Sequence, residues 1–251
     1  MYWSQVRILA GPPRLDCFAI YKMNNNSDFY KWFGTIASKL GNRAISFRKI
    51  FNYLDAQPTP IIIVETGSLR EEGNFLSDGQ STLLFDKYTQ FRGDNSKVYT
   101  VDINPNVTNF CKQIVSDKVE IITGDSVGYL NSFSKSLIKS NKQLSMLYLD
   151  SYDVDFRYPF PSAAHHLKEL TSSIRMLQKN SLVVIDDAPA NIPSNSRILK
   201  TNKIFRCKCK IKNISKPTVG GKGLLINEYA AQIGAKLLFS HYQTGWNEFN
   251  N

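Results

Sequence analysis

Cysteine is scarce in this chain of 251 residues, which has only Cys17, Cys111, Cys207 and Cys209. Four scattered cysteines are too few for a disulfide framework in a chain of this length, so we expect reduced thiols. Cys207 and Cys209 flank one lysine, but no second Cys or His pair stands nearby, which argues against a zinc site. We therefore expect neither disulfides nor zinc to stabilise the fold.

Long apolar runs are also missing. No stretch approaches the roughly 20 apolar residues that a membrane-spanning helix needs. The first residues lack the basic-then-apolar order of a signal peptide. We therefore expect a cytoplasmic protein without a membrane span. The apolar share of 42%, including 12% aromatic residues, suffices for a sizeable core and excludes wholesale disorder.

Acidic residues are absent from Ala188 to Asn227, and this segment accounts for the net charge of +10. Nine of the 31 basic residues lie between Arg197 and Lys222, and the remaining 22 face 21 acids. Because the rest of the chain is nearly neutral, the segment is interpreted first as a solvated basic loop or hairpin. Binding of an acidic substrate, RNA or a membrane surface stays open as an alternative.

The N-terminal residues 1–22 differ in character from the rest of the chain. Met1 to Pro13 has neither helical nor strand periodicity, and it looks like a translated transfer-RNA gene: Val-Arg-Ile matches a TΨC arm and the prolines match the 3′ end. We therefore expect residues 1–22 to be a non-native or disordered leader, with Met23 as the true initiator.

Hydrophobic spacing predicts the organisation of the remaining chain. Apolar residues between Ser27 and Asp55 recur every three or four positions, which predicts two cap helices within residues 23–58. Residues 59–251 are expected to form one domain with a basic insertion at 191–222. Strand and helix patterns alternate there, up to a final strand at 236–242. The predicted fold is α/β and Rossmann-like: a doubly wound, mostly parallel sheet with helices on both faces and an N-terminal helical cap.

Acidic residues stand where the apolar runs of this domain end. The predicted strands are Ile61–Glu65, Val98–Asp102, Val119–Ile122, Leu144–Asp150 and Leu182–Asp186. Charge is costly beside a core, and the carboxyl ends of parallel strands line a ligand crevice, so we expect these acids to serve function. Asp102 is well placed for ribose hydroxyls. Asp125, just after the third strand, suits an adenine amino group or the N-cap of the next helix.

These strand ends resemble those of class I S-adenosylmethionine (SAM)-dependent methyltransferases. The resemblance spans about residues 61–246 and rests on Val-Glu-Thr-Gly, Val-Asp-Ile-Asn-Pro, Thr-Gly-Asp-Ser, Leu-Tyr-Leu-Asp-Ser and Val-Ile-Asp-Asp. It implies SAM as cofactor, and the cofactor-binding candidates are Glu65, Thr66, Gly67, Ser68, Ser81, Asp102, Ile103, Asp125 and Ser126. The family's first motif has closely spaced glycines, but here Gly67 is followed next by Gly73. We therefore expect a long cofactor loop, with contacts from residues 77–82.

The later acids are similar to those of metal-dependent O-methyltransferases, namely the catechol type and the macrocin or cephalosporin-hydroxylase-like groups. This resemblance implies that Asp150, Asp186 and Asp187 bind Mg²⁺ or another divalent cation. It also implies methylation of a hydroxyl of a small molecule or sugar, although N-methylation stays open. In the alternative interpretation, Asp186 and Asp187 are caps or ion-pair partners of the basic segment. Because these acids end strands, we expect Asp186→Ala to leave the fold intact.

The candidates for catalysis at the acceptor are Asp150, Asp153 and His166. Asp153 stands three residues after the first implied metal ligand, where the catechol-type pattern has a lysine. His165 and His166 fall in the first turns of a helix near the strand ends, and histidine titrates near neutral pH. A structural histidine is as well supported as a catalytic one. Glycines at 220–223 suggest a lid, and the basic stretch before it favours an anionic acceptor.

Two other functions stay open. Asp153-Val154-Asp155 matches the Asp-x-Asp motif of a metal-dependent nucleotide-sugar glycosyltransferase, but this leaves the earlier acids without a shared role. Residues 197–222 could belong to a non-enzymatic nucleic-acid-binding protein, although Phe205 is their one aromatic residue for base stacking. The expected partner is therefore a small-molecule acceptor, with nucleic acid disfavoured. Whether the chain forms a homo-oligomer is left open.

Overall fold

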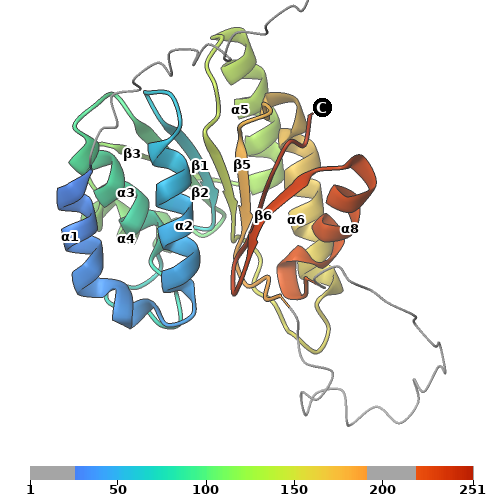
Figure 1. The fold of residues 1–251 in the computed structure, drawn as a ribbon, viewed down its shortest axis with the longest axis horizontal. Helices are drawn as coiled ribbons and strands as arrows, with labels where there is room; N and C mark the ends of the chain where they lie inside the picture. Colours follow the sequence, from blue (N-terminus) through green and yellow to red (C-terminus); the bar gives the residue numbers. More distant parts are fainter. Residues whose placement is uncertain (1–25, 191–218, 251) are drawn as a thin grey trace, which may run out of the picture.

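The computed structural model describes residues 26–190 and 219–250, which form a central sheet with helices on both sides (Figure 1). The predicted leader at 1–22 lies outside the described residues. Most of the predicted basic insertion at 191–222 does so as well, and only residues 219–222 of it are described.

In the described residues, seven strands form one sheet in the order β3-β2-β1-β4-β5-β7-β6. They are β1 (Ile62–Thr66), β2 (Lys97–Asp102), β3 (Val119–Thr123), β4 (Met146–Leu149), β5 (Leu182–Ile185), β6 (Lys236–Ser240) and β7 (Thr244–Asn247). The strands β1 to β5 pair in parallel, whereas β7 is antiparallel to β5 and β6. Strand order reverses between β1 and β4, which is where open α/β sheets bind ligands. The predicted doubly wound, mostly parallel fold is confirmed.

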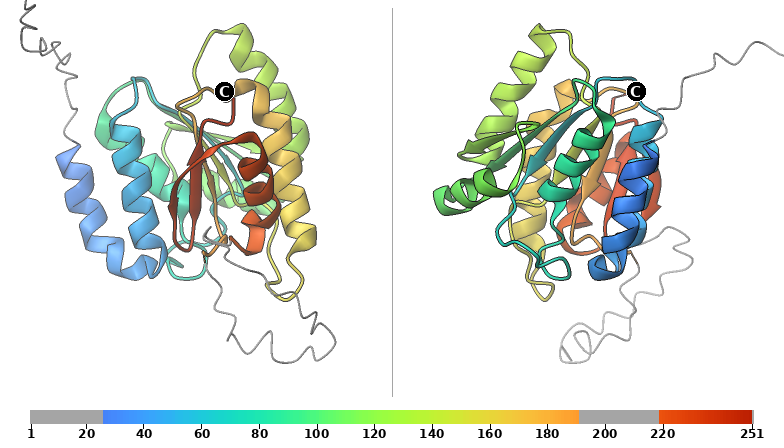
Figure 2. Two further views of the ribbon diagram at one scale, coloured as in Figure 1. Left: turned by 45° about the vertical axis from the view of Figure 1, so that its right-hand side comes forward. Right: turned by 90° about the vertical axis from the view of Figure 1, so that its left-hand side faces the viewer.

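Helices cover both faces of the sheet, as the two turned views show (Figure 2). On the left in Figure 1 lie α1 (Ser27–Ile36), α2 (Arg43–Asp55), α3 (Ser81–Arg92) and α4 (Pro105–Ile114). On the right lie α5 (Ser126–Lys139), α6 (Phe160–Ser173) and α8 (Leu224–Ile233). Short 3-10 helices are η1 (Ala37–Leu40), η2 (Ile174–Met176) and η3 (Gly221–Gly223). None of the described helices combines the length and the apolar character needed to cross a bilayer.

Two apolar cores form because successive side chains of a strand point to opposite faces. On one face, Ile63 and Tyr148 pack with residues of α1, α2 and α3. On the other face, Val64 and Leu149 pack with residues of α5, α6 and α8. Burial on both faces explains why the central strands appear in the sequence as continuous apolar runs.

The strand β7 is absent from the strands predicted above. It is only four residues long, Thr-Gly-Trp-Asn, and Trp246 is its one apolar side chain. The glycine is required here, because a Cβ at position 245 would lie 2.5 Å from Cζ of the Phe239 ring in β6. Since β7 inserts between β5 and β6, the predicted final strand forms the edge of the sheet.

The cap helices are fixed to α3 by an aromatic cluster. The Phe51 ring lies 4.6 Å from that of Phe29 and 5.0 Å from that of Tyr88, between ring centroids. The Tyr88 hydroxyl also donates to Asp55 at 2.8 Å, at the end of α2. These contacts hold α2 in place, and its first residue, Arg43, thereby reaches the carboxyl edge of the sheet.

We expect Phe51→Ala to lower the free energy of unfolding by about 3–5 kcal/mol, because it leaves a cavity among buried rings. The matched control is Ile45→Ala in the same helix, where the side chain is 58% exposed. This control should stay within about 0.5 kcal/mol of the wild type. Urea denaturation measures both variants, and equal effects would contradict the described packing of α2.

Candidate functional site

Two adjoining cavities lie along the carboxyl edge of the sheet. The narrow cavity, of about 30 Å³, is lined in part by Gly67, Ser68, Ser81, Asp102, Asp150 and Ser151. The wide cavity, of about 320 Å³, is lined in part by Asp102, Ile103, Asp125, Ser126, Ser151 and His165. Because Asp102 and Ser151 line both cavities, we treat the two as one cleft.

The cleft gathers most of the predicted cofactor residues. Seven of the nine line it, namely Gly67, Ser68, Ser81, Asp102, Ile103, Asp125 and Ser126. Glu65 and Thr66 are fully buried beneath the cleft and do not line either cavity.

Backbone contacts shape the narrow part of the cleft. One oxygen of Asp102 accepts a hydrogen bond from Ser68 N at 3.2 Å, and the other accepts from Asn104 N at 2.8 Å. Gly67 has a φ of 84°, and a Cβ there would lie 2.6 Å from the Asp150 carbonyl oxygen. Only glycine therefore lets the loop after β1 pass so close to the end of β4.

Glu65 supports the cofactor loop from below. Its Oε2 accepts from Thr82 Oγ1 at 2.7 Å, and that hydroxyl oxygen accepts from Leu69 N at 3.0 Å. The other carboxylate oxygen, Oε1, has no hydrogen-bond partner within the described residues. Burial raises the pKa of Glu65 to about 7, although hydrogen bonds from Ser81 and Thr82 oppose this rise. Glu65 is thus an unusually basic carboxyl group fixed under the cleft.

A second buried acid, Glu169 of α6, stands behind the wide cavity. It accepts from Ser151 Oγ at 2.6 Å, and its Oε1 lies 3.3 Å from Nε2 of His165. The hydrogen bond to Glu169 raises the pKa of His165, which opens onto the cleft. Glu169 was missed in the sequence, although its four-residue spacing from His165 on one helix face is a usable signal.

The structure places His166, a predicted catalytic residue, away from the cleft. The side chain is fully buried, lines neither cavity, and donates from Nδ1 to the Ser162 carbonyl oxygen at 2.7 Å. Burial lowers the pKa of His166 to about 4, so the ring stays neutral at physiological pH. A neutral, enclosed imidazole does not reach an acceptor in the cleft, so this position favours the structural interpretation of His166 over the catalytic one.

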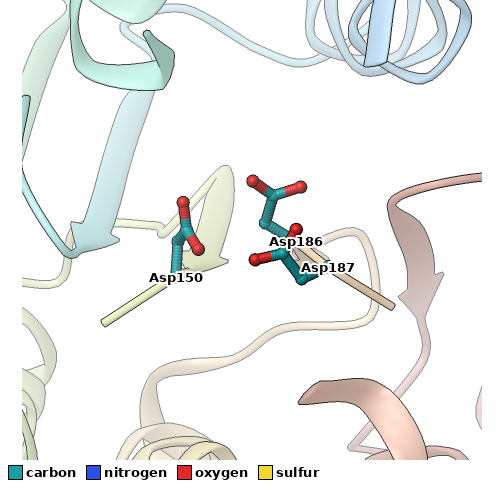
Figure 3. Close-up of side chains that lie close together, drawn as sticks. All are labelled: Asp150, Asp186 and Asp187. Carbon is teal, nitrogen blue, oxygen red and sulfur yellow. The ribbon is translucent and has the colours of Figure 1, made fainter. Parts of the chain in front are cut away.

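The three predicted metal ligands converge beside the narrow cavity (Figure 3). Asp150, Asp186 and Asp187 each place one carboxylate oxygen within 4.8 Å of the other two. Asp150 follows β4 and the pair follows β5, so the parallel pairing of these strands brings the acids together. Asp187 has a φ of 43°, in the left-handed region that non-glycine residues seldom adopt. We call these three residues the acidic triad.

Two buried basic side chains neutralise most of the charge of the acidic triad. Arg43 Nε donates to both oxygens of Asp186, at 3.1 and 3.0 Å, and its Nη2 donates to Asp187 at 3.1 Å. Lys222 Nζ donates to Asp150 Oδ1 and lies 3.2 Å from Asp187 Oδ2. Three carboxylates and two cations leave a formal charge of −1 in this cluster.

Neither basic residue was singled out in the sequence. Arg43 is separated from Asp186 by 143 positions and belongs to a cap helix, so no local pattern connects them. Lys222 was grouped with the solvated basic segment, yet its side chain is only 1% exposed. The glycines around Lys222 were interpreted only as part of a lid. In the structure, Gly221 and Gly223 lie against Asp187 and Ala188, so close that a Cβ would clash.

The acidic triad fits a hard divalent cation. Carboxylate oxygens are preferred ligands of Mg²⁺. Burial, with Asp186 and Asp187 nearby, raises the pKa of Asp150 well above its usual range even though Lys222 lowers it. Burial acts to lower the pKa of Lys222, but Asp150 and Asp187 outweigh it and the pKa is raised. Both shifts act in the direction that reduces the negative charge of the cluster.

The acids of the Asp-x-Asp sequence lie apart from the acidic triad. Asp153 is bound by Arg70 at 3.0 Å with its side chain 77% exposed, and Asp155 is bound by Arg157 at 2.8 Å. Neither belongs to a metal-like group of acids in the part of the chain that the structure describes. Asp153 remains a candidate at the rim, because Arg70 also lines the narrow cavity.

A separate cavity of about 400 Å³ lies near the amino ends of β1, β2 and β4. Pro58, Lys97 and Ser145 are among its lining residues, and none of the lining residues is acidic. It lacks the carboxylates that distinguish the opposite edge, so the cleft beside the acidic triad is the candidate site.

Comparison with solved structures agrees with this architecture. The MycE methyltransferase from the mycinamycin biosynthetic pathway, solved in complex with Mg, SAH and mycinamycin VI, matches 88% of this chain with a TM-score of 0.50. The two proteins share a Rossmann-like α/β fold. Sequence identity is 14%, and the chain spans about half of that protein, 54% of its length. No family model matches the chain, and no curated protein matches it.

We expect the buried Glu65 to make stability depend on pH. Because its pKa in the folded state, about 7, exceeds the ordinary value of 4.5, the folded state binds more protons between these values, and stability falls as pH rises. As the pH rises from 4.5 to 7.5, the free energy of unfolding of the wild type should fall by about 3 kcal/mol more than that of Glu65→Gln. Urea denaturation across this range tests the difference. The exposed Glu120→Gln serves as the control and should follow the wild type.

On the described burial and ion pair, Asp186→Ala is expected to destabilise the fold, whereas the sequence alone led us to expect an intact fold. Asp186 is fully buried, and its loss leaves the Arg43 guanidinium buried without its main partner. We expect a loss of about 3–5 kcal/mol in the free energy of unfolding. The double variant with Arg43→Met should recover part of this loss, and thermal denaturation of the three proteins measures it. Equal stability of wild type and Asp186→Ala would contradict the described ion pair.

Proposed function

We propose that the chain is a class I SAM-dependent methyltransferase that methylates a hydroxyl of a small molecule or sugar with the help of a divalent cation. One observation carries this proposal: Asp150 both lines the narrow cavity beside Gly67 and Ser81 and belongs to the acidic triad. A cofactor in the cleft would therefore hold its reactive end next to the carboxylates that receive the metal and the acceptor.

The shape of the cleft suggests how SAM would lie. The wide cavity suits the adenine ring, with Ile103 and Tyr152 as apolar walls and Asp125 and Ser126 at the start of α5. Asp102, shared by both cavities, would bind the ribose hydroxyls. The methionine end would then enter the narrow cavity, whose 30 Å³ must widen to admit it. Glu65 and Thr66 would act from beneath by fixing the loop.

The acidic triad would hold the metal mainly through Asp150 and Asp187. Asp186 adds negative charge, but both its oxygens already accept from Arg43. A bound divalent cation supplies the charge that lowers the pKa of an acceptor hydroxyl. Arg43 keeps Asp186 oriented and closes the cap side of the site, where it also donates to the Leu76 carbonyl oxygen. Positioning of the acceptor against the methyl group would supply much of the rate.

Binding of SAM, measured by isothermal titration calorimetry, tests the proposal without knowledge of the acceptor. We expect the wild type to bind SAM and S-adenosylhomocysteine. Asp102→Asn should weaken both by about 10- to 100-fold, because a charged acceptor of ribose hydrogen bonds becomes a neutral amide.

Asp117→Asn, which changes an exposed acid in the turn after α4, is the matched control and should bind like the wild type. Absence of SAM binding to the folded protein would refute the proposed function. Equal affinities of Asp102→Asn and the wild type would refute the position given to the ribose.

A further inference from the structure

The Lys222 ammonium already occupies the place of a cation within the acidic triad. Its Nζ contacts Asp150 Oδ1, lies 3.2 Å from Asp187 Oδ2 and lies 3.5 Å from the Asp150 carbonyl oxygen. The side chain is 1% exposed, so this ammonium group is not a surface charge that meets the acids by chance. Its three contacts are oxygens, and a divalent cation between Asp150 and Asp187 would use two of the same atoms.

The backbone around Lys222 is built to deliver the ammonium group to this place. Lys222 N donates to the Asp187 carbonyl oxygen at 3.1 Å, so the residue is fixed at its base to the residue that its Nζ also contacts. This approach requires Gly221, whose φ is 54° and where a Cβ would lie 2.0 Å from the Asp187 carbonyl oxygen. The four-carbon stem of a lysine has rotatable bonds, so a movement of the ammonium group does not require the backbone to move.

Arg43 cannot play the same part, because its guanidinium is held from several directions. It binds both oxygens of Asp186 and one of Asp187, donates to the Leu76 carbonyl oxygen, and stacks 4.5 Å over the Tyr242 ring. Arg43 is thus held by groups inside and outside the acidic triad. The Lys222 ammonium group, in contrast, makes its polar contacts within the described residues with Asp150 and Asp187 alone.

Charge and space make Lys222 and a divalent cation mutually exclusive. Ligand oxygens lie about 2.0–2.1 Å from Mg²⁺, so an ion held by Asp150 and Asp187 would need the space between them, which Nζ now occupies. With both cations present the cluster would carry a formal charge of +1 and strong repulsion. With the metal in place of the ammonium group, three carboxylates, Arg43 and the divalent cation sum to zero.

We propose that Lys222 is a built-in competitor of the divalent cation, occupying the site between Asp150 and Asp187 until the metal displaces it. This inference rests on the metal site of the proposed function. The competition sets the metal affinity and keeps the buried carboxylates neutralised when no metal is bound. Binding of the metal is thereby coupled to a displacement of the Lys222 side chain, which lies next to the cleft.

The decisive variant is Lys222→Met, which removes the charge and keeps the length of the side chain. Binding of Mn²⁺, followed by the electron paramagnetic resonance signal of the free ion, should be at least tenfold tighter in Lys222→Met than in the wild type. Lys222→Arg retains the charge and should bind no tighter than the wild type. Lys179→Met removes an exposed charge elsewhere and should match the wild type. Equal or weaker Mn²⁺ binding by Lys222→Met would overturn the proposal.

A second measurement uses the wild type and so does not depend on the folding of a variant. In protein labelled with ¹³C at lysine Cε, the Lys222 resonance should shift on addition of Mg²⁺, while the other lysine resonances stay in place. An unmoved Lys222 resonance at saturating Mg²⁺ would overturn the competition, as would the absence of metal binding in both proteins.

SAM binding, measured on the same samples, separates this inference from the proposed function. Intact SAM binding without the predicted change in metal affinity would overturn the role of Lys222 alone. Loss of SAM binding would refute the cofactor assignment, whatever the metal result.

Discussion

Neutralisation of three carboxylates at adjacent strand ends is the constraint on which the rest of this structure depends. The pairing of β4 with β5 forces Asp150 next to Asp186 and Asp187, and burial there makes uncompensated charge costly. The structure meets this cost with Arg43 from the cap and Lys222 from η3, the 3-10 helix before α8. The cap and the C-terminal loop are therefore tied to the sheet through the site itself.

This arrangement joins stability to function in one cluster. Arg43 binds Asp186 only because α2 packs on α3 through aromatic rings, so the cap contributes a charged group at the carboxyl edge. Lys222 reaches Asp150 only because glycine at 221 admits close backbone contact with Asp187. In the proposed enzyme, the cation that stabilises the metal-free protein and the cation that serves the reaction would compete for the same oxygens.

Much of the fold follows from local patterns. Apolar runs long enough for buried strands, separated by helical spacing, predict a mostly parallel sheet, and each acid at a strand end then falls on one edge. For this reason the sequence could predict seven residues that line the cleft. It could not predict the strand β7, because four residues containing Gly245 carry too weak a strand pattern. The sequence did not separate His165 from His166, because position on a helix does not tell which histidine faces the cleft and which faces the core.

The sequence alone determined the fold class, the edge of the sheet where the candidate site lies and the identities of the converging acids, because periodicity and strand-end position are local properties. Only the tertiary structure decided what surrounds those acids. Arg43 and Lys222 come from segments 143 positions before Asp186 and 72 positions after Asp150, and no spacing along the chain relates them. Charge compensation is a contact between distant elements, so it becomes visible only once the cap, the sheet and the final loop are packed together.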